Sequence, residues 1–197
     1  MNPNPVTDGL PRSVEVGGRR VPIETGFRRW IRIMQAADDP RPHNAVKVEA
    51  MLRLAYGHPY PPEVGADRQG AVDAALDFLH FNEPAPPPTE RQRSKVRKRT
   101  WDWSYDAPYL IADFQREYGI DLTDMGLDMH WWRFWALFRG LGESSRSRDL
   151  ISVRQADEKG LGKAQKADLR ERKRQALLPA RNEEEARANT KIRWSEQ

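Results

Sequence analysis

An aromatic segment that runs from Leu127 to Leu141 constrains the possible folds of this sequence most strongly, because it holds three of the seven tryptophans. Its large apolar residues recur at the spacing of one broad helical face: Leu127, Trp131, Phe134, Trp135, Phe138 and Leu141. Gly140 lies where such a helix would end. Each aromatic side chain can bury roughly 150–250 Å². We therefore predict that this helix forms the centre of the core.

One residue of this segment has two open interpretations. Trp132 lies roughly 100° around the helix from Trp131, away from the centre of the apolar face. It either packs on the N-terminal elements or stays exposed for a partner, since exposed tryptophan is enriched at protein interfaces.

The composition narrows the class of protein. Hydrophobic residues make up 38% and charged residues 31% of the chain, with a formal net charge of +4, which is typical of a soluble protein with a modest core. There is no cysteine, which excludes disulfides, thiolate catalysis and cysteine-based metal sites. No apolar run approaches the roughly 20 residues that span a bilayer, and the N-terminus lacks a signal-peptide pattern, so we expect no membrane association.

The order of patterns predicts a mainly α fold, a single helical domain with a small N-terminal β-hairpin and a charged C-terminal extension that is helical or disordered. The expected segments are a disordered lead (1–10), a hairpin with helices (11–82), a Pro-rich basic linker (83–100), an aromatic helical core (101–155) and the charged extension (156–197). The hairpin is indicated by Gly17-Gly18 between two alternating runs.

Caps and helix breakers place the helices. The expected N-caps are Thr25, Asp106 and either Ser144 or Ser145. Helices are predicted over residues 27–37, 44–56, 68–81 and 163–178, after Asp106 as far as Gly119, and after the Ser144-Ser145 pair.

A basic segment follows a run with four prolines between residues 83 and 89. Its cations are Arg91, Arg93, Lys95, Arg97, Lys98 and Arg99. By composition it is either a nucleic-acid-binding patch or a solvated connector. No aromatic residues are interleaved with these cations for stacking on bases, so we favour the connector.

The sequence offers no constellation for catalysis, a metal ion or a cofactor, and we expect a protein that is not an enzyme. None of the four histidines is paired at the spacing of metal ligands, and His130 flanks an apolar face where a structural role is expected. Asp113, Asp121, Asp124 and Asp128 lie close in sequence but lack the spacing of a calcium loop, and their positions suit caps and turns.

Several motifs over roughly residues 10–155 resemble a family of small bacteriophage proteins, the "gp fifteen" type, from tailed phages and prophages of Gram-positive bacteria. The matching motifs are the segments 10–18, 23–28, 105–114, 118–122 and 130–137, followed by Gly140-Leu141 and by Ile151 with Arg154. Proteins of this family are encoded between the major tail protein and the tape-measure protein.

The resemblance implies a tail-assembly chaperone that coats the amphipathic tape-measure protein in the host bacterial cytoplasm before the tail tube polymerises. Implied partners are the tape-measure protein, a second chaperone, the major tail protein and further copies of the chain, whereas a membrane is not expected and nucleic acid is disfavoured. Two alternatives remain, a structural tail component retained in the virion and a nucleic-acid-binding protein. We predict that five aromatic and Met residues are exposed and bind the partner: Trp101, Trp103, Tyr105, Met129 and Trp132.

Overall fold

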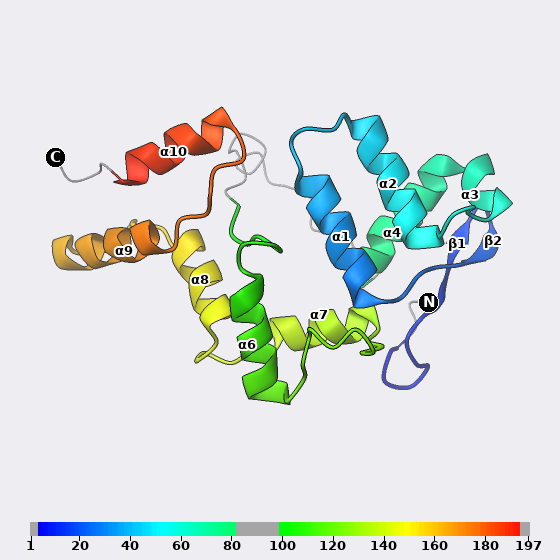
Figure 1. Cartoon of the computed structure of the whole chain (residues 1–197), viewed down its shortest axis with the longest axis horizontal. Helices are drawn as coiled ribbons and strands as arrows, with labels where there is room; N and C mark the ends of the chain where they lie inside the picture. The colour runs from blue at the N-terminus through cyan, green and yellow to red at the C-terminus, as the bar shows by residue number, and fades with distance from the viewer. Residues whose placement is uncertain (1–3, 82–98, 194–197) are drawn as a thin grey trace. The chain divides into compact units, whose positions relative to one another are not determined.

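The computed structural model describes residues 4–81 and 99–193, and the chain divides into two compact units. Unit 1 combines Met1–Pro87 with Asp128–Arg139, and unit 2 combines Pro88–Leu127 with Gly140–Gln197. The expected aromatic core over residues 101–155 is therefore shared between the two units. The elements of both units are labelled in Figure 1.

Unit 1 begins with the expected hairpin. Strand β1 (Ser13–Val16) pairs antiparallel with β2 (Arg19–Pro22), and Val16 faces Arg19 across the turn. Gly17 and Gly18 take φ values of +57° and +75°, which glycine adopts without steric cost in a tight hairpin turn. The side chains of Val16 and Val21 are buried, so the hairpin contributes directly to the core of unit 1.

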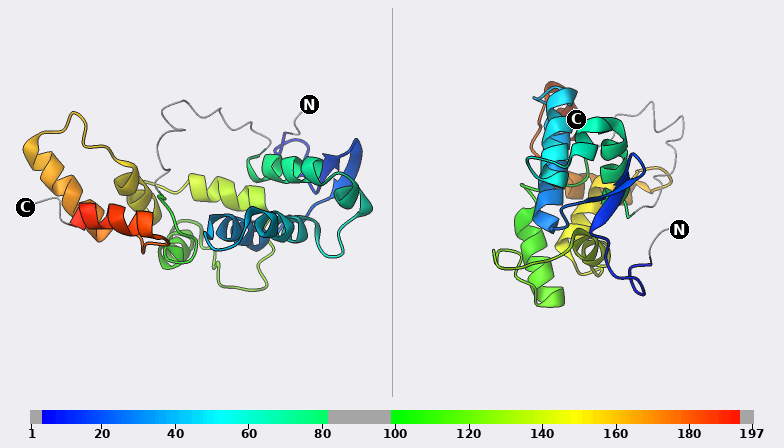
Figure 2. Two further views of the ribbon diagram at one scale, coloured as in Figure 1. Left: turned by 90° about the horizontal axis from the view of Figure 1, so that it is seen from above. Right: turned by 90° about the vertical axis from the view of Figure 1, so that its right-hand side faces the viewer.

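Five helices complete the described part of unit 1, and their course can be followed in Figures 1 and 2. They are α1 (Phe27–Asp38), α2 (Asn44–Tyr56), α3 (Pro62–Ala66), α4 (Arg68–Leu79) and α7 (Trp131–Arg139). Helix α1 packs on α2 and α7, while α4 packs on α2 and β1. The short helix α3, which begins with a proline in its first turn, was not expected from the sequence.

The core of unit 1 is aromatic. Trp30 of α1 lies between Phe78 of α4 and Trp131 of α7, with ring centroids 4.8 and 6.3 Å away. Phe27 stacks on Phe134 at 4.9 Å. All five side chains are at most 3% exposed, so the aromatic segment of α7 is confirmed as part of a core.

The start of α7 differs from the prediction. The amide of Phe27 donates to the carbonyl of Met129 at 3.0 Å, and the amide of Trp131 donates to the carbonyl of Thr25 at 2.6 Å. Because residues 129–131 pair with the backbone before α1, the helix begins at Trp131 rather than Leu127. Thr25 was expected to be the N-cap of α1, but Gly26 occupies that position, and no side chain caps the helix there.

Unit 2 contains α6 (Ala107–Tyr118), α8 (Arg146–Gln155), α9 (Lys163–Gln175) and α10 (Glu183–Arg193) among its described residues. Each of these helices packs on the next one along the chain. Leu150, Val153 and Ala176 form a buried apolar cluster. Ser145 caps α8 as expected, and Gly119 ends α6 with a φ of +64°.

The predicted class is confirmed, since the described chain is mainly helical with a hairpin near its N-terminus. The charged extension forms two helices, α9 and α10. Within the expected disordered lead, the amides of Thr7 and Asp8 donate to the carbonyl of Asn4, so residues 4–8 form a turn. Most of the expected linker over 83–100 lies outside the described residues.

Candidate protein-binding site

Two of the nominated partner-binding residues belong to the core of unit 1, which corrects the expectation that they are exposed. Met129 and Trp132 are each only 2% exposed. The indole N–H of Trp132 donates to the carbonyl of Phe78 at 2.8 Å, and that of Trp131 donates to the carbonyl of Leu79 at 3.1 Å. The last carbonyls of a helix lack intrahelical partners. The two tryptophans therefore close the C-terminus of α4.

His130 has the structural role that the sequence indicated. Its Nδ1 accepts the amide of Trp132 at 3.0 Å, and its Nε2 lies 2.8 Å from the carbonyl oxygen of Pro11. A carbonyl accepts and an amide donates, so the ring is neutral with its proton on Nε2. Burial lowers the pKa of His130, and the hydrogen bond to Pro11 only partly opposes this effect.

The remaining nominated residues gather just before α6 in unit 2. Tyr105 is 51% exposed, whereas Trp101 and Trp103 are half-buried, with ring centroids 5.9 Å apart at an edge-to-face angle. Tyr109, in the first turn of α6, is 40% exposed and lies under the guanidinium of Arg146. We call Trp101, Trp103, Tyr105 and Tyr109 the aromatic cluster.

Asp102 fixes the backbone that carries the aromatic cluster. One of its carboxylate oxygens accepts the amides of Ser104 and Tyr105 at 2.8 and 2.9 Å, and the other accepts Arg181 at 2.8 Å. Burial alone would raise the pKa of Asp102, but the hydrogen bonds from Tyr105, Ser104 and Arg181 outweigh it and hold this pKa below its usual range. The loop is therefore held by a charged group that remains ionised.

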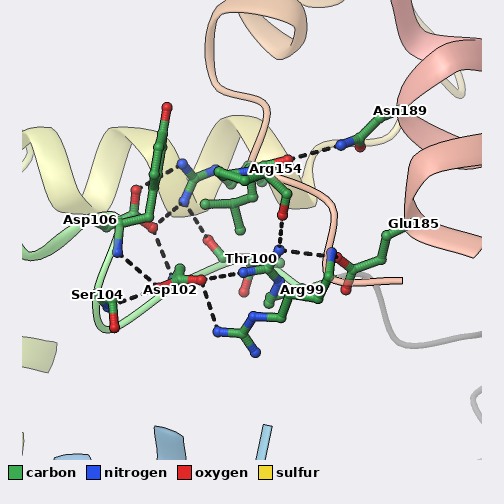
Figure 3. Close-up of polar contacts among 12 residues, drawn as sticks. Arg99, Thr100, Asp102, Ser104, Asp106, Arg154, Glu185 and Asn189 are labelled. Carbon is green, nitrogen blue, oxygen red and sulfur yellow. Dashed lines mark hydrogen bonds and ion pairs between the residues drawn. The ribbon is translucent and has the colours of Figure 1, made fainter. Parts of the chain in front are cut away.

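Asp106 forms the base of the same region (Figure 3). It is fully buried, and instead of capping α6 with its side chain it binds Arg154 through two hydrogen bonds of 2.6 and 2.9 Å. Asp106 also accepts the amide of Asp102 at 2.9 Å, while Arg154 donates to the carbonyls of Thr100 and Ala176. This bidentate pair joins α6 to α8 and to the end of α9.

Arg99 was predicted to belong to the basic patch, and the structure corrects this prediction. Its side chain is 12% exposed and pairs with Asp102 and with Glu185 of α10, as Figure 3 shows. A guanidinium that is buried and paired is not part of a surface for phosphate. The other five cations, Arg91, Arg93, Lys95, Arg97 and Lys98, lie outside the described residues.

The acidic residues near α6 act as caps and turn formers, as the sequence suggested. Asp113 is buried and accepts the hydroxyl of Ser145 at 2.7 Å and the amide of Ser147 at 2.8 Å, at the N-terminus of α8. Burial would raise the pKa of Asp113, but these hydrogen bonds lower it overall. Asp121 and Asp124 accept backbone amides two residues on. Within residues 4–81 and 99–193, no group of three or more His, Asp and Glu could hold a metal ion.

A groove lies beside the polar network in unit 2 and encloses about 260 Å³. One wall is the segment after α9, with Ala176, Leu177 and Leu178, and the opposite wall is α10, with Ala188 and Ile192. Arg99, Arg154 and Glu185 line it at its charged side. The sequence did not reveal this groove, because it depends on how α10 folds back on the end of α9.

These features suit protein–protein contact. Exposed tyrosines on a hydrogen-bonded base supply large apolar area at low entropic cost, and a groove with a charged side suits a helix with one apolar stripe. In the described part of the chain, no helix combines the length and the apolar character needed to cross a membrane.

The comparison with protein families matches residues 6–178 to the family described as Bacteriophage Gp15 protein. Neither the curated proteins nor the solved structures yield a match to the chain. The family match covers residues of both units and ends before α10 of unit 2. The chain therefore belongs to the Bacteriophage Gp15 protein family and is a bacteriophage protein.

Proposed function

We propose that this phage protein is a tail-assembly chaperone that coats the tape-measure protein before the tail tube polymerises. A tape-measure protein is a long amphipathic helical rod that would aggregate when free. A chaperone for it must cover the apolar stripe and later leave, which requires weak contacts repeated along the rod. On this proposal the chain acts in the cytoplasm of a Gram-positive host, and its gene lies between those of the major tail and tape-measure proteins.

The observation that carries the proposal is the aromatic cluster on its rigid base. Tyr105 and Tyr109 expose half and two-fifths of their surface, although their backbone is held in place. The amide of Tyr105 donates to the buried carboxylate of Asp102, and the amide of Tyr109 donates to the main-chain carbonyl of Asp106 in the first turn of α6. Aromatic side chains that are exposed but held in place are typical anchors of protein interfaces. Met129 and Trp132, which are buried, are no longer candidates for this contact.

The test is co-expression of the full chain with the tape-measure protein of its phage. We expect a soluble complex whose mass, measured by light scattering, corresponds to many copies of the chain on one tape measure. The double variant Tyr105→Ala/Tyr109→Ala should leave the tape measure insoluble while the chain itself stays folded. Val46→Ser is the matched control, since Val46 is an exposed apolar residue of unit 1, 58% exposed, outside the cluster.

Two results would contradict the proposal. A tape measure that stays insoluble with the wild-type chain removes its main support, and the chain in purified virions at the stoichiometry of a tail subunit identifies a structural component instead. A DNA-binding function predicts affinity that falls steeply with salt, but the pairing of Arg99 removes one cation from that surface.

A further inference from the structure

Helix α10 is attached to the rest of unit 2 by polar contacts rather than by a buried apolar face. None of its described side chains is buried. Glu185 accepts Arg99 at 3.0 Å and the amide of Arg181 at 2.9 Å, and Asn189 donates to the carbonyl of Leu178 at 2.8 Å. The side chain of Glu185 keeps 31% of its surface exposed, and a helix held by such polar contacts is easier to detach than one that buries an apolar face. Helix α10 is therefore the described helix of unit 2 that is easiest to displace.

The groove between α10 and the segment after α9 is only partly filled. Helix α10 presents Ala188 and Ile192, four residues apart and so on one face, toward the walls formed by Ala176 and Leu178. Ala176 and Leu178 are buried, yet about 260 Å³ remains in the groove and Ala188 stays exposed. A larger side chain at the position of Ala188 would bury more apolar surface, and each added methylene that is fully buried favours binding.

The family match ends at residue 178, so the wall of Ala176 and Leu178 lies within it, whereas α10 lies beyond it. One wall of the groove is thus built by the family region, and the opposite wall is built by a helix that follows it.

We propose that α10 occupies in cis a groove that binds an amphipathic helix of a partner protein in trans. The partner helix carries a carboxylate three residues before the first of two apolar side chains spaced four apart, as α10 carries Glu185 before Ala188 and Ile192. Its apolar side chains are larger than those of α10, and its carboxylate pairs with Arg99. Naming the tape-measure protein as the source of this helix rests on the proposed function, whereas the groove and the pattern do not.

The experiment measures binding of a fluorescein-labelled peptide to the full chain by fluorescence anisotropy. The peptide contains residues 179–193 with leucine at both groove positions (Ala188→Leu and Ile192→Leu). Glu185→Gln in the chain removes the ion pair of α10 with Arg99, and we expect it to tighten peptide binding about tenfold, the effect of one hydrogen bond to a charged group. Ala188→Leu in the chain fills the groove in cis, and we expect it to weaken binding about fivefold or more.

Glu183→Gln is the matched control. It also removes one carboxylate from the first turn of α10, but Glu183 is 91% exposed and pairs only with Arg187, at 3.4 Å, among the contacts of the described residues. We expect its peptide affinity to equal that of the wild type. Hydrogen exchange should show faster exchange of α10 amides in Glu185→Gln with unchanged exchange in α6 and α8, which separates displacement of α10 from loss of the fold.

The inference is overturned if the peptide binds no variant, or if Glu185→Gln, Glu183→Gln and Ala188→Leu bind it equally. Co-expression separates this inference from the proposed function. If the peptide obeys the expected order but the tape measure stays insoluble, the groove is real and the proposed function fails. If all three variants solubilise the tape measure equally and the peptide does not bind, the function stands and the role of α10 is wrong.

Discussion

Removing the charge of Asp106 should destabilise unit 2 strongly. Asp106 is fully buried and the side chain of Arg154 is 7% exposed. Asp106→Asn keeps the volume of the side chain but leaves the guanidinium of Arg154 without its counter-charge. Breaking a buried ion pair by removing one partner costs about 3–5 kcal/mol. The two carbonyls that Arg154 also contacts, those of Thr100 and Ala176, keep the expected cost near the lower end, about 3 kcal/mol.

The assay is urea unfolding followed by circular dichroism, with hydrogen exchange of α6 and α8 amides to assign the transition to unit 2. For a slope of about 1–3 kcal/mol per M, a loss of about 3 kcal/mol moves the midpoint of unit 2 down by about 1–3 M. The double variant Asp106→Leu/Arg154→Met removes both charges, and we expect it to recover most of the loss, because well-packed apolar replacements of a buried pair are often neutral.

The control is Arg187→Gln, which breaks the exposed pair with Glu183 and should leave the midpoint unchanged. The reasoning is refuted if Asp106→Asn shifts the midpoint no more than Arg187→Gln does. It is also refuted if the loss of stability in the double variant equals the sum of the losses in Asp106→Leu and Arg154→Met alone, because the two side chains would then show no coupling energy.

Three further predictions concern single side chains. Burial lowers the pKa of His130 below 6.5, so the unfolded state binds more protons than the folded state between the two pKa values. We therefore expect the contribution of His130 to stability to be complete above pH 6.5 and to be lost as the pH falls through the folded pKa. The urea midpoint should drop between pH 7.5 and 5.5 in the wild type and drop less in His130→Gln. Trp132→Phe keeps an aromatic side chain but removes the pyrrole ring with its N–H donor to the carbonyl of Phe78. We expect a loss of about 1–3 kcal/mol by urea unfolding, a result that an unchanged midpoint would refute. The pKa of Asp113 is lowered, so its contribution to folding stability is present above the unfolded pKa and is lost as the pH falls through the folded pKa. Asp113→Asn should therefore be less stable than the wild type at pH 7, and its acid-induced unfolding of unit 2 should be less steep.

Local patterns in the sequence predicted local structure well. The pair Gly17-Gly18 indicated the hairpin, and the apolar spacing in residues 44–56 predicted α2 with its observed bounds. Gly119 ended α6 and Ser145 began α8 as expected, because glycine readily adopts the left-handed conformation that ends a helix and a serine hydroxyl can accept a free amide of the first turn.

Predictions from the sequence were incomplete or wrong where a side chain binds a segment that is distant in the chain. Trp132 looked available for a partner because it lies off the main apolar face, but its indole binds the end of α4, 54 residues earlier. Asp106 occupies the N-cap position of α6 as predicted, but its carboxylate binds Arg154, 48 residues later, instead of capping the helix. Arg99 looked like one cation among six until Asp102 and Glu185 were seen beside it. Such pairs cannot be predicted from the spacing of residues along the chain.

The position of α7 in the chain limits how this protein can be cut or assembled. Segment Asp128–Arg139 belongs to unit 1, yet unit 2 residues precede and follow it. During synthesis the core around Trp30 stays incomplete until Phe134 leaves the ribosome, after the first part of unit 2 has already emerged. A fragment ending at residue 87 would leave the carbonyls of Phe78 and Leu79 without their indole donors. No single cut separates the two units, so an independent unit 1 requires α7 to be rejoined genetically to residue 87.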